Sequence, residues 1–404
     1  MRFIGFFTAF ITVIGLGHVY VGRRLVSSSR LPKRQKRIGW ALVGGSLLLN
    51  VSPIFTRIFM RERPVEDVFA WIGYIALGFF SIAAVLTVGR DSVVLAIRLG
   101  KAIGGASRKL IGHNPGALTP TDPDRRKLLI AGTNLAVVGA AALITSYGVF
   151  EARRRPRVKR VEVPLPNLPP EFDGFKIVQI SDIHVGPTIK RDWVEMVVNE
   201  VAQTKADLVA FTGDLIDGTV PYLRNDTEPI KELSAPFGRY YVTGNHEYYS
   251  GVLPWLKEVD RLGWDILMNE HRVLEKDGAR LVISGVTDFT AGSFYPDQAS
   301  DPHKAVASAP SDVTRILLAH QPKSVFEASK AGYDLQLSGH THGGQFFPWD
   351  NLARLAQPYL HGLHWHENMW VYVSRGTGYW GPPVRIGQPS EVTLITLRRK
   401  QPLA

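Results

Sequence analysis

Five short polar clusters follow five predicted β-strands, in the order in which those strands occur along the chain. Their chemistry-bearing residues are Asp182, His184, Asp214, Asp217, Asn245, His246, His320, His340 and His342. Carboxylate oxygens, amide oxygens and imidazole nitrogens together suit zinc, manganese or iron. Two such cations about 3.5–4 Å apart could clamp a phosphoryl group and lower the pKa of a bridging water. The pattern therefore predicts metal-dependent hydrolysis.

Each cluster taken alone has a simpler explanation. The Gly-Asp pair that contains Asp214 is a common turn, and Asn245 is a residue type that often begins a helix. His340 and His342 are separated by one residue, so on extended backbone both rings point to one face. It is the ordered recurrence of all five clusters, each after a strand, that favours a shared site.

The elements that must position these clusters are short β-rich runs. Strands are expected at 175–180, 208–211, 239–242, 281–284, 315–319, 335–338, 369–374 and 391–397. Helical patterns at 193–203 and 253–262 alternate with the early strands, which is typical of βαβ units. The later strands have few helices between them and predict a mixed sheet or a two-sheet sandwich. Ligands bind at the carboxyl edge of such sheets, where the clusters lie.

The ordered motifs D-x-H, G-D-x-x-D, G-N-H-E, a single H and G-H-T-H resemble those of the calcineurin-like metallophosphoesterase family. The resemblance extends from about Lys176 to Leu397, and its closest form is the membrane-anchored bacterial phosphohydrolase branch. It implies an α/β fold, a four-layer α/β/β/α sandwich, with two divalent metal ions (Mn, Zn or Fe) as cofactors.

The resemblance also implies a role for each residue. The implied ligands are Asp182, His184 and His342 for the first metal, Asp214 as the bridge, and Asn245, His320 and His340 for the second. His246 is expected to face the substrate as proton donor or oxyanion partner, oriented by Asp217, and Glu247 to be structural. Three further histidines are expected to be surface or packing residues of a loop: His361, His364 and His366.

The first 150 residues carry a different signal, because they contain long stretches almost free of charge. These stretches are 3–21, 38–55, 68–88 and 128–150. Each is long enough to cross a hydrocarbon core of roughly 30 Å, and none shows a regular polar face. We therefore expect about four transmembrane helices in residues 1–150, with an interfacial helix at 92–104. A basic, Pro-rich linker is expected at 151–170 and the metallophosphoesterase domain at 171–404.

Charge divides the chain in the same way. Residues 1–160 carry 25 Lys and Arg against 7 Asp and Glu, whereas residues 161–404 carry 22 against 29. The C-terminal part lacks a basic footprint, so no nucleic-acid partner is expected. The chain has no cysteine, which excludes disulfides, thiolate metal sites and a cysteine nucleophile.

The loop charges predict an orientation. Placing the two longer loops in the cytoplasm puts 15 basic residues inside and 10 outside, which the positive-inside rule favours. The catalytic domain is then extracytoplasmic, on a multi-pass protein of the plasma (inner) membrane. Arg125 and Arg126 before an apolar stretch resemble a twin-arginine export signal, and a plain basic helix flank explains them equally well.

The sequence thus predicts a membrane-anchored, dinuclear-metal phosphoesterase that hydrolyses phosphate esters by metal-bound hydroxide. A phosphodiester or a lipid-linked pyrophosphate fits the anchor best, with membrane lipids as partners. The apolar loop 346–370 either rests on the bilayer or packs on its own domain. Two alternatives stay open: a UDP-2,3-diacylglucosamine pyrophosphate hydrolase, which needs cytoplasmic access, and a metal-binding cell-envelope module without turnover.

Overall fold

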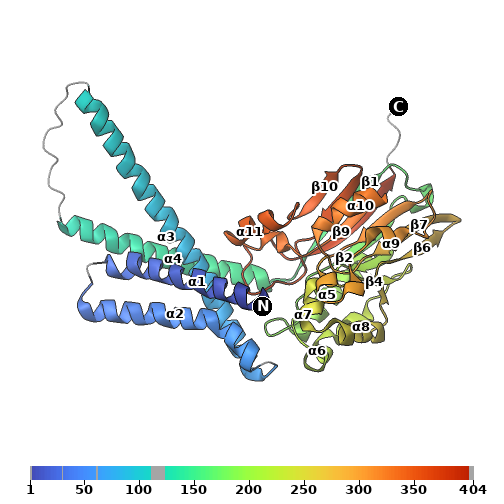
Figure 1. The fold of residues 1–404 in the computed structure, drawn as a ribbon, viewed down its shortest axis with the longest axis horizontal. Helices are drawn as coiled ribbons and strands as arrows, with labels where there is room; N and C mark the ends of the chain where they lie inside the picture. Colours follow the sequence, from blue (N-terminus) through green and yellow to red (C-terminus); the bar gives the residue numbers. More distant parts are fainter. Residues whose placement is uncertain (1, 30, 61, 111–122, 400–404) are drawn as a thin grey trace. The chain divides into compact units, whose positions relative to one another are not determined.

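The chain divides into two compact units, Met1–Tyr147 and Gly148–Ala404, which we call the membrane unit and the catalytic unit. The computed structural model describes residues 2–29, 31–60, 62–110 and 123–399 (Figure 1).

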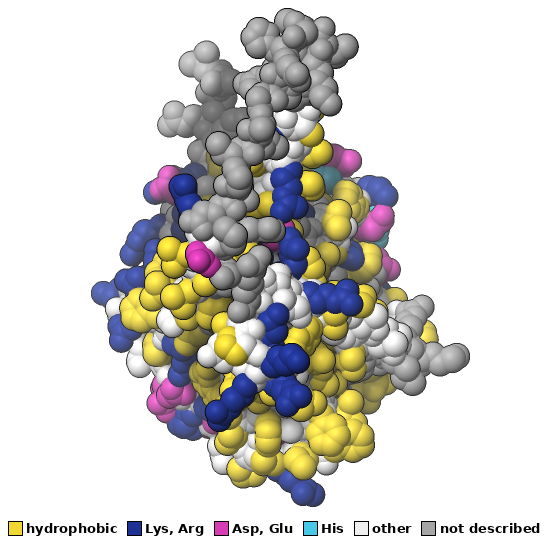
Figure 2. All heavy atoms as spheres, turned by 90° about the vertical axis from the view of Figure 1, so that its left-hand side faces the viewer, with side chains coloured by type: hydrophobic (Ala, Val, Ile, Leu, Met, Phe, Trp, Pro, Cys, Tyr) yellow, Lys and Arg dark blue, Asp and Glu magenta, His cyan; other side chains and the backbone are white. Residues whose placement is uncertain are grey.

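The membrane unit is built from long helices. They are α1 (Arg2–Gly22), the π-helical η1 (Arg23–Ser27), α2 (Lys33–Phe59), α3 (Pro64–Leu110) and α4 (Pro123–Arg153), which continues into the catalytic unit. Four helices among the described residues are long and apolar enough to cross a membrane. Large apolar side chains such as Leu48 and Leu143 are 74% exposed, and hydrophobic side chains with Lys and Arg among them cover the face drawn in Figure 2.

The segment 92–104, expected as an interfacial helix, is helical and continues α3 without a break. No proline interrupts the helix there, and Asp91, directly before the segment, is paired. The Asp91 carboxylate accepts hydrogen bonds from Tyr20 at 2.6 Å and from Arg24.

The catalytic unit contains two six-stranded sheets. The first has the order β1 (Arg157–Leu165), β12 (Glu391–Arg399), β2 (Lys176–Ile180), β3 (Leu208–Phe211), β4 (Arg239–Tyr241) and β5 (Asp265–Ile266). The second has the order β10 (Gly362–His366), β11 (Met369–Val373), β9 (Leu335–Ser338), β8 (Thr314–Leu318), β7 (Ala279–Gly285) and β6 (Glu270–Lys276). Strands β2 to β5 are parallel, as are β7, β8, β9 and β11, so both sheets have a carboxyl edge that can carry ligands.

Helices accompany both sheets. The α-helices are α5 (Arg191–Thr204), α6 (Val220–Thr227), α7 (Asn245–Ser250), α8 (Val252–Arg261), α9 (Pro302–Val306), α10 (Val325–Ala331) and α11 (Trp349–Ala356). Short 3-10 turns are η2 (Pro170–Phe172), η3 (Glu228–Glu232), η4 (Ala291–Ser293), η5 (Pro296–Gln298), η6 (Pro322–Ser324) and η7 (His342–Gly344).

The alternation of side chains along each strand produces the layers. In β3, Leu208 and Ala210 join the core between the two sheets, whereas Val209 and Phe211 pack with the helices that include α5 and α8. On the other sheet, Leu317 and Val371 pack with α9 and α10. Helices therefore cover the outer face of each sheet, and the predicted four-layer α/β/β/α sandwich is confirmed.

The segment expected as a linker, 151–170, is ordered instead. It contains β1, which pairs in parallel with β12, and within β1 Val163 and Leu165 are buried. The basic residues obscured this strand because they alternate with the apolar ones and lie on its exposed positions. Likewise His364 and His366 lie on strand β10 and not in a loop, and the range 346–370 contains α11 and β10.

Candidate metal centre

The nine predicted site residues lie on loops that leave the carboxyl ends of five strands. The loop after β2 carries Asp182 and His184, and the loop after β3 carries Asp214 and Asp217. Helix α7 follows β4 and begins with Asn245 and His246; His320 follows β8, and His340 and His342 follow β9. These five strands come from both sheets, so the loops meet where the carboxyl edges of the two sheets converge.

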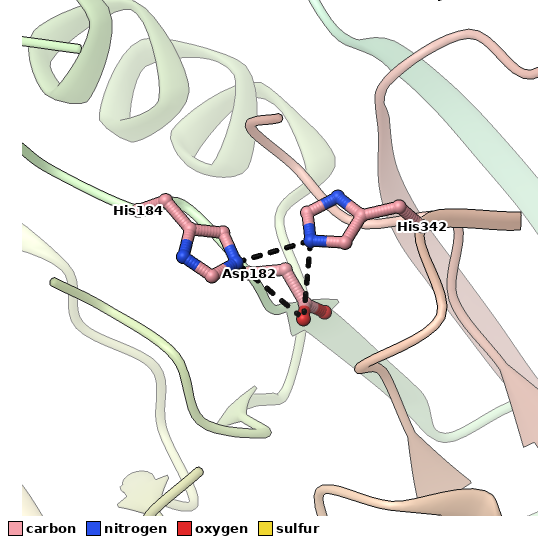
Figure 3. Close-up of side chains that lie close together, drawn as sticks. All are labelled: Asp182, His184 and His342. Carbon is pink, nitrogen blue, oxygen red and sulfur yellow. Dashed lines mark hydrogen bonds and ion pairs between the residues drawn. The ribbon is translucent and has the colours of Figure 1, made fainter. Parts of the chain in front are cut away.

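A first cluster comprises Asp182, His184 and His342 (Figure 3). The two Nε2 atoms of the histidines lie 3.0 Å apart, and Asp182 Oδ1 lies 4.0 Å from His184 Nε2 and 3.7 Å from His342 Nε2. All three side chains are buried and point toward one another.

A second cluster comprises Asp214, His320 and His340. His320 Nε2 lies 3.1 Å from Asp214 Oδ2, 3.2 Å from His340 Nδ1 and 3.2 Å from Asn245 Oδ1. The other ring nitrogen of His320 is hydrogen-bonded to the Thr212 carbonyl at 2.7 Å, which fixes the ring with Nε2 toward the cluster.

Asp214 lies between the two clusters. Its Oδ2 atom is 3.1 Å from His320 Nε2 in the second cluster and 3.7 Å from His184 Nε2 in the first. Its Oδ1 atom accepts a hydrogen bond from the backbone N–H of His246 at 2.9 Å. The backbone contact holds the carboxylate in place, so Oδ2 is available to both clusters at once.

His246 lies beside these two clusters and forms a third group of potential metal ligands with His184 and Asp217. Its Nδ1 is hydrogen-bonded to Asp217 Oδ1, and its Nε2 is 3.9 Å from Asp214 Oδ2. The second Asp217 oxygen is 3.4 Å from His184 Nδ1, so this carboxylate contacts two histidines. This arrangement leaves the Nε2 side of His246 facing the clusters.

The backbone at the site is strained. Asp182, His184, Asp214, His340 and His342 all have positive φ angles, between 51° and 71°. Residues with a Cβ rarely adopt this left-handed region, and such strain concentrates at functional sites where the surrounding fold enforces it. The strand ends therefore hold these five side chains in directions that an ordinary turn would not give.

Glycines allow the loops to approach closely. A Cβ on Gly244 would lie 2.1 Å from Asp214 Oδ1, and one on Gly339 would lie 2.0 Å from Ser181 Oγ and 2.2 Å from Asp182 Oδ2. Both glycines precede predicted ligands, so the G-N-H-E and G-H-T-H motifs need glycine for space as well as for their polar residues.

Burial controls the protonation of two histidines. Burial lowers the pKa of His340 to about 3, and the neighbouring His320 contributes in the same direction. Burial and the adjacent His184 hold the pKa of His342 well below its usual range. Both rings are therefore neutral at pH 7, with a lone pair that can bind a cation.

Two of the three site aspartates, Asp214 and Asp217, have a lowered carboxyl pKa. Burial opposes ionisation of Asp214 and Asp217, but neighbouring histidines outweigh it, and the pKa of each carboxyl is lowered. His320 contributes most to this for Asp214, and His246 for Asp217. Asp182 and His320 shift the other way: burial raises the pKa of Asp182, and although burial opposes protonation of His320, the adjacent Asp214 outweighs it and raises the pKa of that ring well above its usual range.

This donor set fits divalent cations. In each cluster a carboxylate and two imidazole nitrogens converge within 4.8 Å of one another in a buried place. Buried acceptors of this kind need a positive charge to compensate them, and nitrogen and oxygen ligands suit first-row metals.

Two contributors to the site were missed or only partly described by the sequence. Glu247, expected to be structural, accepts backbone hydrogen bonds from Asp214 at 3.0 Å, Leu215 at 2.8 Å and Gly244 at 2.6 Å, and so joins two ligand loops. Arg385 is fully buried and lies 3.0 Å from His342 Nδ1 through its Nη2. No motif surrounds Arg385, so no sequence signal distinguished it from a surface arginine.

Comparison with known proteins agrees with this geometry. The family model described as calcineurin-like phosphoesterase matches residues 175–344. A Bos taurus transmembrane protein with metallophosphoesterase domain is 34% identical over 95% of this chain and 86% of its own length. An uncharacterized metallophosphoesterase of Helicobacter pylori is 39% identical over 69% of this chain and 74% of its own. An uncharacterized metallophosphoesterase of Campylobacter jejuni is 28% identical over 99% of this chain and 100% of its own length.

The similarity to the bovine and Campylobacter proteins includes the membrane unit. Together with the four apolar helices, it identifies the protein as a membrane protein. The buried carboxylate and imidazole clusters, the matched family model and these relatives lead to one conclusion. The chain belongs to the calcineurin-like metallophosphoesterase family and is a metal-dependent phosphoric ester hydrolase.

Proposed function

We propose that the protein is a dinuclear phosphoesterase that cleaves a phosphodiester or a lipid-linked pyrophosphate. The position of Asp214 carries the proposal, because one of its oxygens is 3.1 Å from a histidine of one cluster and 3.7 Å from a histidine of the other. A carboxylate shared in this way is how two cations are held at close distance.

The ligand roles follow from the two clusters. Asp182, His184 and His342 would hold the first ion, Asn245, His320 and His340 the second, and Asp214 both. When bound, the cations supply Lewis acidity toward the phosphoryl oxygens and activate a water. His246 donates a proton to the leaving oxygen from Nε2, while Asp217 at Nδ1 keeps the ring oriented and stabilises its charged form.

Hydrolysis of a chromogenic phosphodiester by the purified full-length chain tests this proposal. We expect turnover that is lost with a chelator and restored by manganese, zinc or iron. Absence of turnover with every divalent metal would favour the metal-binding module. A soluble fragment must begin before Arg157, because β1 is a strand of the first sheet.

We further propose that the catalytic unit is extracytoplasmic, on the basis of the loop charges and the even number of apolar helices. C-terminal fusions test this orientation: an active alkaline phosphatase fusion with a dark green fluorescent protein fusion is expected. A fluorescent fusion would reverse the orientation and favour hydrolysis of a cytoplasmic nucleotide-linked glycolipid such as UDP-2,3-diacylglucosamine.

A further inference from the structure

Exposed aromatic side chains surround the part of the metal centre that contains His246. The His246 ring centroid lies 5.2 Å from that of Tyr249 and 5.6 Å from that of Trp380, and Phe294 lies 5.8 Å from Tyr249. Tyr249, Trp380 and Phe294 are 45%, 50% and 37% exposed. We call these three residues the aromatic rim. Such a group next to the proposed proton donor presents apolar area to whatever approaches the site.

Helix α11 exposes large apolar side chains on the surface of the catalytic unit. None of its eight residues is buried, and Leu352 and Leu355 are 57% and 85% exposed. Asp350 faces the unit, since a Cβ on Gly344 would lie only 2.3 Å from the Asp350 Cβ, whereas the polar Asn351 and Arg354 are exposed together with the two leucines. A surface helix in water points its polar residues outward and its leucines inward. Helix α11 is therefore suited to an apolar or interfacial surrounding.

The aromatic rim, the metal centre and the end of a membrane helix are joined by hydrogen bonds. The catalytic unit begins at Gly148, inside α4, and the Gly148 carbonyl accepts a hydrogen bond from the Arg385 N–H at 3.0 Å. A few residues earlier, the Trp380 N–H donates to Gln345 Oε1 at 3.0 Å. Gln345 follows His342 by three residues and immediately precedes the segment that leads into α11.

We propose that the aromatic rim and α11 form a docking surface for the lipid headgroup region of the membrane that holds α4. Tryptophan and tyrosine favour this region, and amphipathic helices lie in it with their apolar side toward the acyl chains. Helix α4 continues into the catalytic unit, and its Gly148 carbonyl is hydrogen-bonded to the segment that follows Trp380, so the rim-bearing segment belongs to a unit attached directly to a membrane helix. The inference rests on the proposed function for its consequence, that the substrate is a phosphate ester carried by a membrane lipid.

Single spin labels on the full-length chain test the docking surface. The chain has no cysteine, so one introduced cysteine gives one label. Leu355→Cys places it on α11. Asp312→Cys is the matched control, because Asp312 is 79% exposed and precedes β8, at the edge of the sheet opposite the metal centre. Both variants are reconstituted in phosphatidylcholine vesicles that contain phosphatidylglycerol.

Collision with oxygen, which concentrates in lipid, and with a water-soluble nickel chelate reports the surroundings of each label. We expect oxygen to dominate at position 355 and the chelate at position 312. Equal access of the chelate to both positions would overturn the proposal. So would protection of position 355 from both reagents, which would mean that protein covers α11. This readout needs no turnover, so it stays interpretable if the proposed function fails.

Kinetics test the substrate class. Leu352→Glu combined with Leu355→Glu should raise KM about tenfold for an acylated nitrophenyl phosphodiester in phosphatidylcholine vesicles, because apolar contact with the bilayer is lost. Asn351→Glu, on the polar side of α11, is the control. Water-soluble bis(4-nitrophenyl) phosphate shows whether the metal centre is intact. An equal loss on both substrates, or no change on the acylated one, would overturn a lipid-borne substrate.

Discussion

The two units of the molecule place apolar residues in opposite positions. In the catalytic unit, leucines such as Leu208 and Leu281 are fully buried between the sheets. In the membrane unit, Leu48 and Leu143 face outward, whereas His18 and Asn50 are buried and hydrogen-bonded to one another and to Ser46 or backbone. Each unit buries the side chains that its surroundings solvate poorly. Water solvates leucine poorly, and lipid solvates imidazole and amide groups poorly.

The comparison teaches that buried polar groups serve different purposes in the two units. In the membrane unit, the buried hydroxyls of Ser81, Thr87 and Thr145 donate to backbone carbonyls of their own helix, and His18 of α1 contacts Ser46 and Asn50 of α2. In the catalytic unit, buried carboxylates and imidazoles converge on shared points and leave acceptors that a cation must compensate. The predictions below separate these two cases, since each changes one unit and leaves the other as a reference.

The largest effect is expected from Asp214→Asn. A neutral amide cannot hold two dications at bridging distance, so bound metal and activity should both fall, activity by more than about 10³-fold. Metal analysis and phosphodiester turnover measure this, with Asp312→Asn as an exposed control. Membrane insertion of the chain should not change. Two bound ions with normal turnover would contradict the bridging role.

His246→Ala should leave metal binding intact and slow the hydrolytic step. Metal content should stay near that of the wild type, while kcat falls by about 10²–10⁴-fold for a poor leaving group. With nitrophenolate as leaving group the loss should shrink, since that oxygen needs less help from a proton. A loss of equal size for both leaving groups would indicate that His246 positions the substrate instead.

Arg385→Leu should destabilise the catalytic unit by about 3–5 kcal/mol. The guanidinium donates to the carbonyls of Arg375 at 2.8 Å and Gln388 at 2.9 Å, and these acceptors would stay buried without a partner. Burial lowers the pKa of Arg385 to about 10, so it is charged at neutral pH. Denaturant unfolding measures the change. Arg398→Leu, which removes an exposed ion pair with Glu162, should leave stability nearly unchanged.

The smallest expected changes in stability come from replacing one glycine by alanine in each unit. Gly339→Ala should cost about 1–3 kcal/mol, because its Cβ would lie 2.0 Å from Ser181 Oγ. Gly44→Ala meets no atom within 4 Å in α2, and should change stability by less than about 1 kcal/mol, in the stabilising direction. Thermal unfolding of the full chain in detergent compares the two. Similar shifts of the unfolding temperature in both variants would contradict the expected difference between the two glycine positions.

The sequence predicted the central strands of both sheets and missed the edge strands. The eight strands expected from apolar runs are the eight central strands of the two sheets. Those missed are β1, β5, β6 and β10, which are the four edge strands. An edge strand packs on one side only, so charged residues such as Arg160 and histidines such as His364 interrupt its apolar pattern. The linker prediction and the loop prediction for His364 and His366 failed for this reason.

More of the candidate site than of the fold could be predicted from the sequence. The types of the site residues and their order along the chain are enough to identify them. The structure brings all nine predicted residues together, and their roles as ligands, proton donor and orienting carboxylate stay predictions. Arg385 and α11 could not be found in this way. Burial of an arginine and outward orientation of leucines depend on packing that no local spacing encodes.

The placement of β12 has a consequence for the synthesis of the protein. Strand β12 lies between β1 and β2, although both precede it by more than two hundred residues. While the ribosome is still making the chain, the strand next to the last membrane helix has no neighbour to pair with. The first sheet closes only after residue 399 has emerged. A nonsense codon that removes β12 should therefore leave an inserted chain that cannot complete its first sheet.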